Sequence, residues 1–389
     1  MTSESIVFTI FLIFTGAAVL ASVALLARQA LLIAYIVLGV LVGPAGFGLV
    51  ADTALLRDMA HVGIIFLLFL LGLNLHPQKL VQLFRQTLIV TLASSVAFAA
   101  LGYTVARLFG IGGGDAVVIG IAMAFSSTII GLKLLPTTVL HHRRTGEVII
   151  SVLLLQDLIA IVTLLGLHGS AGGAAQAADV LWLALALPLL AAGAYLVERY
   201  VLMGLVRRFD RIQEYLFLLA IGWCLGVAQA AHSMGLSYEI GAFIAGVAVA
   251  ASPVSRFIAE SLKPLRDFFL VMFFFTLGAA FDVRAAATVV LPAVLLAGLA
   301  LSIKPVVFRF LMVSVSENNR LAWEIGFRLG QMSEFSLLIV FYASEAELIA
   351  ASTAYVVQLA TMLTFIGSTY LVVLRYPTPI AVSERLRRD

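Results

Sequence analysis

The chain has 389 residues, of which 62% are apolar and only 12% charged, whereas soluble domains have about 45–50% apolar and about 25% charged residues. Its mean hydropathy of +1.11 excludes a soluble globular protein and predicts one whose solvent is lipid. The net charge of +3 gives no indication of nucleic-acid binding, and the single cysteine, Cys224, excludes a disulfide framework and a cysteine-based metal site.

Thirteen apolar segments, most of them about 20 residues long, predict transmembrane helices. Their ranges are 5–26, 30–49, 54–73, 86–109, 116–137, 147–168, 180–206, 212–231, 238–252, 265–281, 287–313, 321–343 and 349–374. The first segment has no basic region before it and continues at full transmembrane length, so we expect no cleavable signal peptide. The sequence predicts one transmembrane domain over 1–375, a short cytoplasmic tail over 376–389 and no soluble regulatory domain.

Basic residues are concentrated in the connections on one side of the predicted membrane. Nineteen of the 24 Lys and Arg residues lie on that side, against Arg57, Arg107 and Arg284 on the other. Because basic residues favour the cytoplasmic side, we expect the N-terminus outside and the C-terminus in the cytoplasm.

Thirteen crossings fit two six-helix halves joined by a linker helix. The eighth helix would then correspond to the first helix of the other half. Seven crossings separate the two, and because seven is odd, the second half has the opposite orientation in the membrane. We therefore predict an all-α membrane protein with inverted repeats. Residues 1–82 and 212–284 are expected to form a scaffold, 86–168 and 287–374 an ion-site core, and 180–206 the linker.

Three ionisable residues, Asp157, Lys304 and Glu334, lie nine or more residues from either end of their apolar segments. Such groups are unfavourable in a bilayer by at least about 2.5–3.5 kcal/mol each and are candidates for function. Gln156 precedes Asp157, and the two offer oxygen ligands that suit a partly dehydrated cation. The alternatives are structural: a packing partner for Asp157, an interfacial position for Lys304, or an ion pair between Glu334 and a neighbouring helix.

Two polar islands interrupt otherwise apolar helices. The first contains Ser126, Ser127 and Thr128, and the second runs from Gly330 to Glu334. They occupy equivalent places in the two predicted halves, where interrupted helices indicate a transport site near the membrane midplane. We therefore predict two interrupted helices that cross at the site.

Two weaker features concern regulation. His141 and His142, beside Arg143 and Arg144, could sense pH at the cytoplasmic face. The segment SRFIAESLK at 255–263 is short and amphipathic, and we expect it to lie along the membrane surface.

Several segments resemble one known family in their order and spacing. They are IVLGVLVGPAGFG at 36–48, FLLGLNL at 69–75, AFSSTIIGLKLL at 124–135, LLLQDLIAI at 153–161, IGAFIAGVAVA at 240–250, PLRDFFLVMFFFTLGAAFD at 264–282, Lys304 in its helix, and GQMSEFSLLI at 330–339. The chain resembles bacterial monovalent cation:proton antiporters, especially the Kef-type potassium/proton group.

The resemblance implies roles for residues already identified. Asp157 would bind the cation and the proton in turn, with Gln156 beside it. Ser126, Ser127 and Thr128 would support the site from the unwound helix, Lys304 would be the basic residue beside it, and Glu334 the membrane-embedded glutamate. Asn74 stands where Kef-like chains usually have Glu, and Gln331–Ser333 replaces a more glycine-rich run.

We therefore predict a secondary antiporter, not an enzyme, that exchanges potassium or another monovalent cation for protons by alternating access. It is expected as a homodimer in the bacterial inner membrane, in contact with lipid and without a cofactor, and a cytoplasmic regulatory domain or subunit outside this chain would be a further partner. Sodium/proton exchange is the alternative within transport. A gated potassium channel is the alternative of another class, although no TVGYG-like filter is present.

Overall fold

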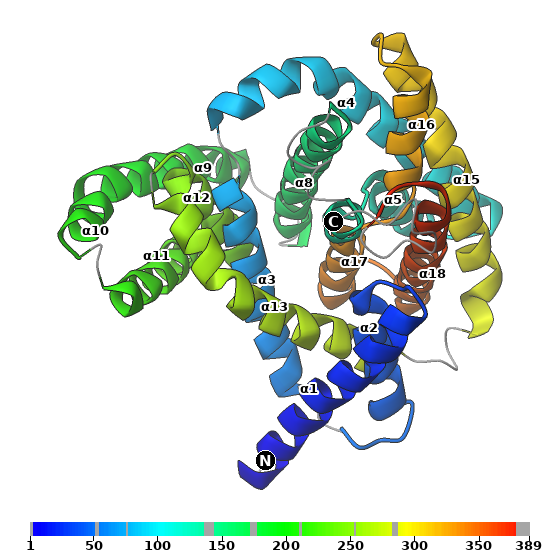
Figure 1. Ribbon diagram of the computed structural model, residues 1–389, viewed down its shortest axis with the longest axis horizontal. Coiled ribbons are helices and arrows are strands. Elements are labelled where there is room, and N and C mark those ends of the chain that lie inside the picture. The colour runs from blue at the N-terminus through cyan, green and yellow to red at the C-terminus, as the bar shows by residue number, and fades with distance from the viewer. Residues whose placement is uncertain are drawn as a thin grey trace. The chain divides into compact units, whose positions relative to one another are not determined.

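The computed structural model describes residues 3–50, 54–74, 77–135, 144–171, 177–209, 212–252, 254–281 and 287–378 (Figure 1). Helices make up nearly all of these ranges, and no β-strand occurs within them. Eight of the helices are long and apolar enough to cross a membrane. The chain is therefore a multi-pass, all-α membrane protein, as its composition predicts.

The helices follow the predicted apolar segments closely. In chain order they are α1 (Ser3–Leu26), α2 (Leu31–Val42), α3 (Ala54–Asn74), α4 (Pro77–Leu108), α5 (Gly113–Ala124), α6 (Thr128–Lys133), α8 (Arg144–Ala171), α9 (Ala177–Val197), the π-helical turn η1 (Glu198–Leu202), α10 (Met203–Phe209), α11 (Gln213–Ser233), α12 (Tyr238–Ala250), α13 (Ser255–Ala279), the 3-10 turn η2 (Ala287–Val289), α15 (Val290–Ser314), α16 (Asn319–Arg328), α17 (Glu334–Glu345) and α18 (Ala351–Arg375). The segments predicted at 116–137 and 321–343 are each divided into two helices.

The chain divides into two compact units. The first unit comprises residues 1–49, 82–164 and 278–389, and the second comprises 50–81 and 165–277. Both ranges of the predicted ion-site core lie almost entirely in the first unit. Residues 1–49 belong to that unit as well, whereas the prediction grouped them with the scaffold.

In the first unit, helices from distant parts of the sequence pack around the two divided segments. Helix α17 packs on α5 and α18, while α15 packs on α16 and α18 (Figure 1). Buried hydroxyl side chains line α18, among them Thr361, Thr364 and Ser368. The interior of this unit is therefore more polar than lipid-facing helices require.

In the second unit, small residues allow α3 and α12 to approach closely. A Cβ atom on Gly72 would lie 2.4 Å from the Phe243 carbonyl oxygen, and one on Gly246 would lie 2.1 Å from the Phe69 carbonyl oxygen. Apolar packing between membrane helices depends on such close backbone contact, because lipid leaves little hydrophobic driving force. The core of this unit also contains Cys224, which is fully buried.

The predicted surface segment at 255–263 is not a separate element. Residues Ser255–Ala279 form one continuous helix, α13, with Pro264 inside it. Ile258 and Leu262 are buried in the core of the second unit, so the apolar face of this segment packs against protein. The segment is the first part of a helix that continues through Pro264, and its position along the membrane surface stays a prediction.

Candidate ion-binding site

The first interruption separates α5 from α6. Phe125 is extended, with φ −92° and ψ 151°, and α6 begins again at Thr128. The Ser127 hydroxyl oxygen accepts a hydrogen bond from the Ile130 N–H at 3.1 Å. It therefore caps α6 in the manner expected of a serine before a helix, which explains why a run of hydroxyl residues marks this break.

The second interruption separates α16 from α17. The Ser333 hydroxyl oxygen accepts from the Phe335 N–H at 3.1 Å, and the Ser333 N–H donates to the Ser336 hydroxyl oxygen at 3.2 Å. The Met332 N–H donates to the Thr364 hydroxyl oxygen of α18 at 3.0 Å. This break, like the first, is built from short hydroxyl side chains that replace lost helical hydrogen bonds.

The two interruptions contact each other directly. The Ser126 hydroxyl donates to the Leu329 carbonyl oxygen at 2.8 Å, and the Gln331 side-chain amide donates to the Ser127 carbonyl oxygen at 3.3 Å. The prediction that the two polar islands are interrupted and meet is confirmed by these contacts within the first unit.

Lys304 lies between the two interruptions and binds backbone from both. Its ammonium group donates to the Phe125 carbonyl oxygen at 2.8 Å and to the Gln331 carbonyl oxygen at 2.9 Å, and its nitrogen is 5.0 Å from the centroid of the Phe98 ring. The side chain is fully buried, so Lys304 does not reach a membrane interface. Among the described residues Lys304 forms no ion pair with a carboxylate, so it is not the partner in the alternative that pairs Glu334 with a neighbouring helix.

Gln156 holds the first interruption from the opposite side. Its Oε1 accepts from the Ser126 N–H at 3.0 Å, and its Nε2 donates to the Ala124 carbonyl oxygen at 3.3 Å. Backbone polar groups at membrane depth must be satisfied within the protein. Gln156 and Lys304 together satisfy three such groups between Ala124 and Ser126.

Asp157 and Glu334 bind neighbouring residues at the start of α6. The Thr128 hydroxyl lies 3.2 Å from Oδ1 and 3.0 Å from Oδ2 of Asp157, and the Ile129 N–H donates to Oε1 of Glu334 at 3.3 Å. Both carboxyl groups are buried: the exposed fraction is 2% for Asp157 and 4% for Glu334. The Oε2 atom of Glu334 has no hydrogen-bond partner among the described residues.

The structure thus brings all seven predicted site residues together. Asp157, Gln156, Ser126, Ser127, Thr128, Lys304 and Glu334 are joined by the contacts above and belong to one compact unit. The sequence interpretation missed Thr364, which binds the second break, and Ser368, whose hydroxyl donates to Oε1 of Gln331 at 2.9 Å. The recurrence of hydroxyl residues at 361, 364 and 368, on one face of an apolar helix, would have indicated them.

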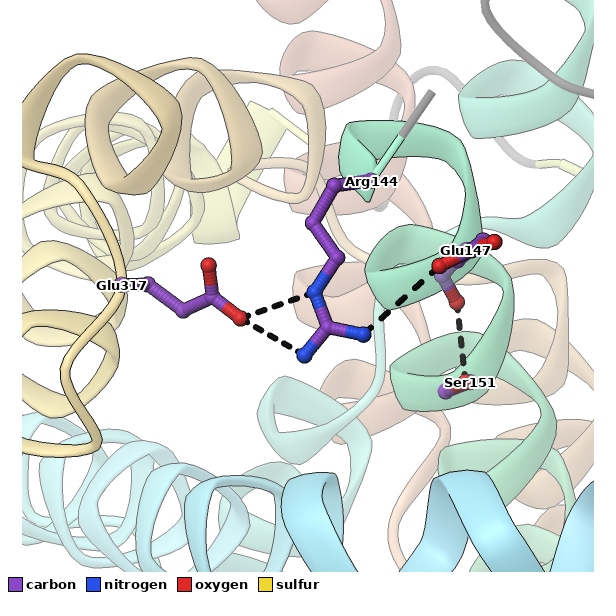
Figure 2. A network of polar contacts seen from close by, with 4 residues as sticks. All are labelled: Arg144, Glu147, Ser151 and Glu317. Atoms are coloured by element: carbon purple, nitrogen blue, oxygen red, sulfur yellow. Dashed lines mark hydrogen bonds and ion pairs between the residues drawn. The ribbon is translucent and has the colours of Figure 1, made fainter. Parts of the chain in front are cut away.

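A second polar network lies near the ends of α8 and α15. The Arg144 guanidinium donates to Oε1 of Glu317 at 3.1 and 2.9 Å and lies 3.6 Å from Oε2 of Glu147 (Figure 2). It borders a cavity of about 460 Å³. Arg144 is 43% exposed at its side chain, so this network is distinct from the buried site. The predicted pH-sensing pair, His141 and His142, lies outside the described residues.

Another buried charged side chain of the first unit is Arg328, within the apolar segment predicted at 321–343. It ends α16, directly before the second interruption, and 2% of the residue is exposed. Its hydrogen-bond partners lie in three different segments of the first unit.

Two antiporters of Arabidopsis thaliana are similar to this chain in sequence. The chain is 28% identical to K(+) efflux antiporter 4 of Arabidopsis thaliana over 373 residues and 28% identical to K(+) efflux antiporter 6 over 370 residues, covering 93% of this chain in both alignments. It spans only 62% of the length of each of these relatives.

Its fold is similar to the structure of the sodium proton antiporter MjNhaP1 from Methanocaldococcus jannaschii at pH 8. The TM-score is 0.73 at 14% identity, with 95% of each chain covered. The family model described as "Sodium/hydrogen exchanger, transmembrane" matches residues 9–375. The chain therefore belongs to the sodium/hydrogen exchanger family, a family of transporters.

Proposed function

We propose that this chain exchanges potassium, or another monovalent cation, for protons, with Asp157 as the group that binds each in turn. The observation that carries the proposal is the pair of buried carboxyl groups at the start of α6. Asp157 contacts Thr128 and Glu334 contacts Ile129, and the ammonium of Lys304 is bound to backbone carbonyls.

The charge balance of the site supports exchange. With both carboxylates ionised and Lys304 protonated, the three groups leave one uncompensated negative charge in a water-poor interior. Such a charge is strongly unfavourable unless a proton or a cation neutralises it. Either a proton on Asp157 or a cation beside it can neutralise this charge. Because the two are not bound at the same time, binding of one is coupled to release of the other.

The oxygen groups around Asp157 suit a partly dehydrated alkali cation. Thr128 supplies a hydroxyl group, and Oε1 of Gln156 has a second lone pair beside the one that accepts the Ser126 N–H. Carbonyl oxygens near Ser126–Thr128 would complete the shell. In this proposal Ser127 and Lys304 maintain the geometry of the break, and Glu334 supplies the second negative charge.

Potassium is the proposed cation because both relatives are named K(+) efflux antiporters. Sodium is the competing cation, since the family model and the similar fold are named for sodium exchange. Oxygen ligands serve both ions, so the choice depends on the size of the shell.

We propose that the chain crosses the membrane thirteen times in two inverted halves, with its N-terminus outside and its C-terminus in the cytoplasm. The distribution of basic residues and the two interrupted helices at corresponding places support this topology. We further propose a homodimer in a bacterial inner membrane, with alternating access arising from movement of the ion-site core.

The test is proton movement in proteoliposomes supplied in turn with potassium, sodium, rubidium or choline. Potassium-dependent proton movement in wild type that is lost in Asp157→Asn would support the proposal. Wild-type rates in folded Asp157→Asn would overturn Asp157 as the carrier and make Glu334 the leading candidate. Equal proton movement with choline would overturn cation exchange itself.

A further inference from the structure

Arg328 joins three segments of the first unit. Its Nη1 donates to the Leu134 carbonyl oxygen just after α6, at 2.9 Å, and its Nη2 donates to the Pro377 carbonyl oxygen just after α18, at 2.9 Å. Its Nε donates to Oε1 of Glu324, one turn earlier in α16, at 3.0 Å. A single buried side chain therefore links the ends of α6, α16 and α18.

The contacts of Arg328 use the particular shape of its guanidinium group. Glu324 supplies the compensating charge, and the ring of Tyr376 lies 5.7 Å from the guanidinium carbon. A planar guanidinium can bind two carbonyls and a carboxylate in fixed directions, which the ammonium of a lysine cannot do. Because an unpaired buried charge is strongly unfavourable, these partners fix the positions of all three segments relative to one another.

Arg328 and its partners Leu134, Glu324 and Pro377 form a joint between three segments. Helix α6 connects this joint to the ion site. Thr128, at its start, binds Asp157, and Leu134, directly after its last residue, binds Arg328. The intervening backbone is held by hydrogen bonds from the Gly131 N–H to the Ser127 carbonyl and from the Leu134 N–H to the Ile130 carbonyl. Six steps along a helix span about 9 Å, so a shift at the Leu134 end is transmitted to Thr128.

We propose that Arg328 is a positioning residue for cation binding: it fixes α6, and through Thr128 the Asp157 carboxylate, relative to the segment Tyr376–Thr378 that follows α18. The inference rests on the proposed function for its link to cation affinity. In structural terms, Arg328 connects the segment that follows α18 to α6, and α6 in turn contacts Asp157 through Thr128. Movement of the segment Tyr376–Thr378 therefore changes cation affinity through Arg328.

Arg309 provides a matched control. Its guanidinium carbon also lies over an aromatic ring, 5.2 Å from the Trp323 centroid, and its Nε donates to Asn319 at 2.8 Å. These contacts are exposed, and none of them involves α6. The substitutions Arg328→Lys and Arg309→Lys each replace a guanidinium by an ammonium group. Only Arg328→Lys alters the contacts with α6 and the segment after α18.

The first measurement is the cation concentration for half-maximal exchange and the maximal rate, in proteoliposomes containing equal amounts of folded protein. We expect Arg328→Lys to raise the half-maximal concentration by about tenfold, since small misplacements of a binding group weaken function by one to two orders of magnitude. The maximal rate should change much less. Tyr376→Ala should act in the same direction and more weakly, and Arg309→Lys should resemble wild type.

The second measurement does not depend on transport. Hydrogen exchange of the backbone amides between Ser126 and Leu135 should become faster in Arg328→Lys than in Arg309→Lys, and Tyr376→Ala should show the same trend. If wild type shows no exchange of cations for protons, the proposed function fails while this measurement still tests the joint.

Two results would overturn the inference. One is an unchanged half-maximal cation concentration in Arg328→Lys together with a lower maximal rate, which is the behaviour of a merely structural residue. The other is unchanged amide exchange across α6. If Arg328→Lys does not fold, Tyr376→Ala decides the matter by the same two measurements, because its side chain contacts the guanidinium without carrying a charge.

Discussion

The Thr128 hydroxyl lies within hydrogen-bonding distance of both carboxylate oxygens of Asp157, at 3.2 and 3.0 Å, and so connects the first turn of α6 to the middle of α8. A hydroxyl group donates only one hydrogen, so Thr128 can serve one oxygen at a time and leaves the other for a proton or a cation. This contact places the start of the interrupted helix beside the proposed carrier.

Thr128→Val should weaken cation binding while preserving the shape of the side chain. A hydrogen bond to a charged group contributes about 1.5–3 kcal/mol, so we expect the half-maximal cation concentration to rise by about ten- to a hundredfold. Thr128→Ser retains the hydroxyl and should remain close to wild type. Equal values for Val and Ser variants would show that the hydroxyl does not act on the carboxylate.

Asp157→Asn should abolish cation-dependent proton movement without unfolding the protein. The amide keeps the size and hydrogen-bonding capacity of the side chain but cannot hold a negative charge. The control is Glu147→Gln, an exposed carboxylate near the start of the same helix, which should exchange normally. Proton movement is followed with a pH-sensitive dye in vesicles, alongside thermal unfolding to verify the fold.

Protons should compete with the cation at one site. As the pH falls below the titration range of the site, the half-maximal cation concentration should rise by about tenfold per pH unit, because one proton excludes one cation. The maximal rate at saturating cation should stay nearly constant over the same range. A falling maximal rate with constant half-maximal concentration would instead indicate that protons act at a separate regulatory site.

Lys304→Met should destabilise the protein as well as alter transport. Removing the ammonium leaves the buried carbonyls of Phe125 and Gln331 without their donor, and each unsatisfied group costs about 1–3 kcal/mol. We expect a lower unfolding temperature in detergent than for wild type. Lys263→Met, at an exposed position of α13, is the control and should unfold as wild type does.

Glu317→Gln should change little. In the Arg144–Glu317 pair (Figure 2), two guanidinium nitrogens donate to the single oxygen Oε1 at 3.1 and 2.9 Å, and the pair is partly exposed to solvent. Exposed ion pairs contribute at most about 1 kcal/mol and are screened by salt. We expect the unfolding temperature to fall slightly at low ionic strength and to match wild type at high salt. A large loss of stability at high salt would show that the network is structurally essential.

The apolar segments and the ionisable residues inside them were predictable, because lipid imposes simple requirements on length and polarity. Asp157, Lys304 and Glu334 stand out against their apolar neighbours, and hydroxyl residues mark both interruptions. The apolar segment predicted at 265–281 does not begin where its helix begins: α13 starts at Ser255 and continues through Pro264, since a proline inside a membrane helix is tolerated when neighbouring groups satisfy the backbone. No local pattern in the sequence shows whether a helix continues through such a proline or begins after it.

The sequence by itself determined that this is an all-α membrane protein and which side chains in it are expensive to bury. Only the tertiary structure decided their partners: Lys304 binds carbonyls from both breaks rather than a carboxylate, Gln156 holds the backbone around Phe125, and Arg328 joins three helix ends. The physical reason is that a buried polar group takes whichever partner packing brings within about 3 Å, and those partners lie up to 194 residues away in the chain.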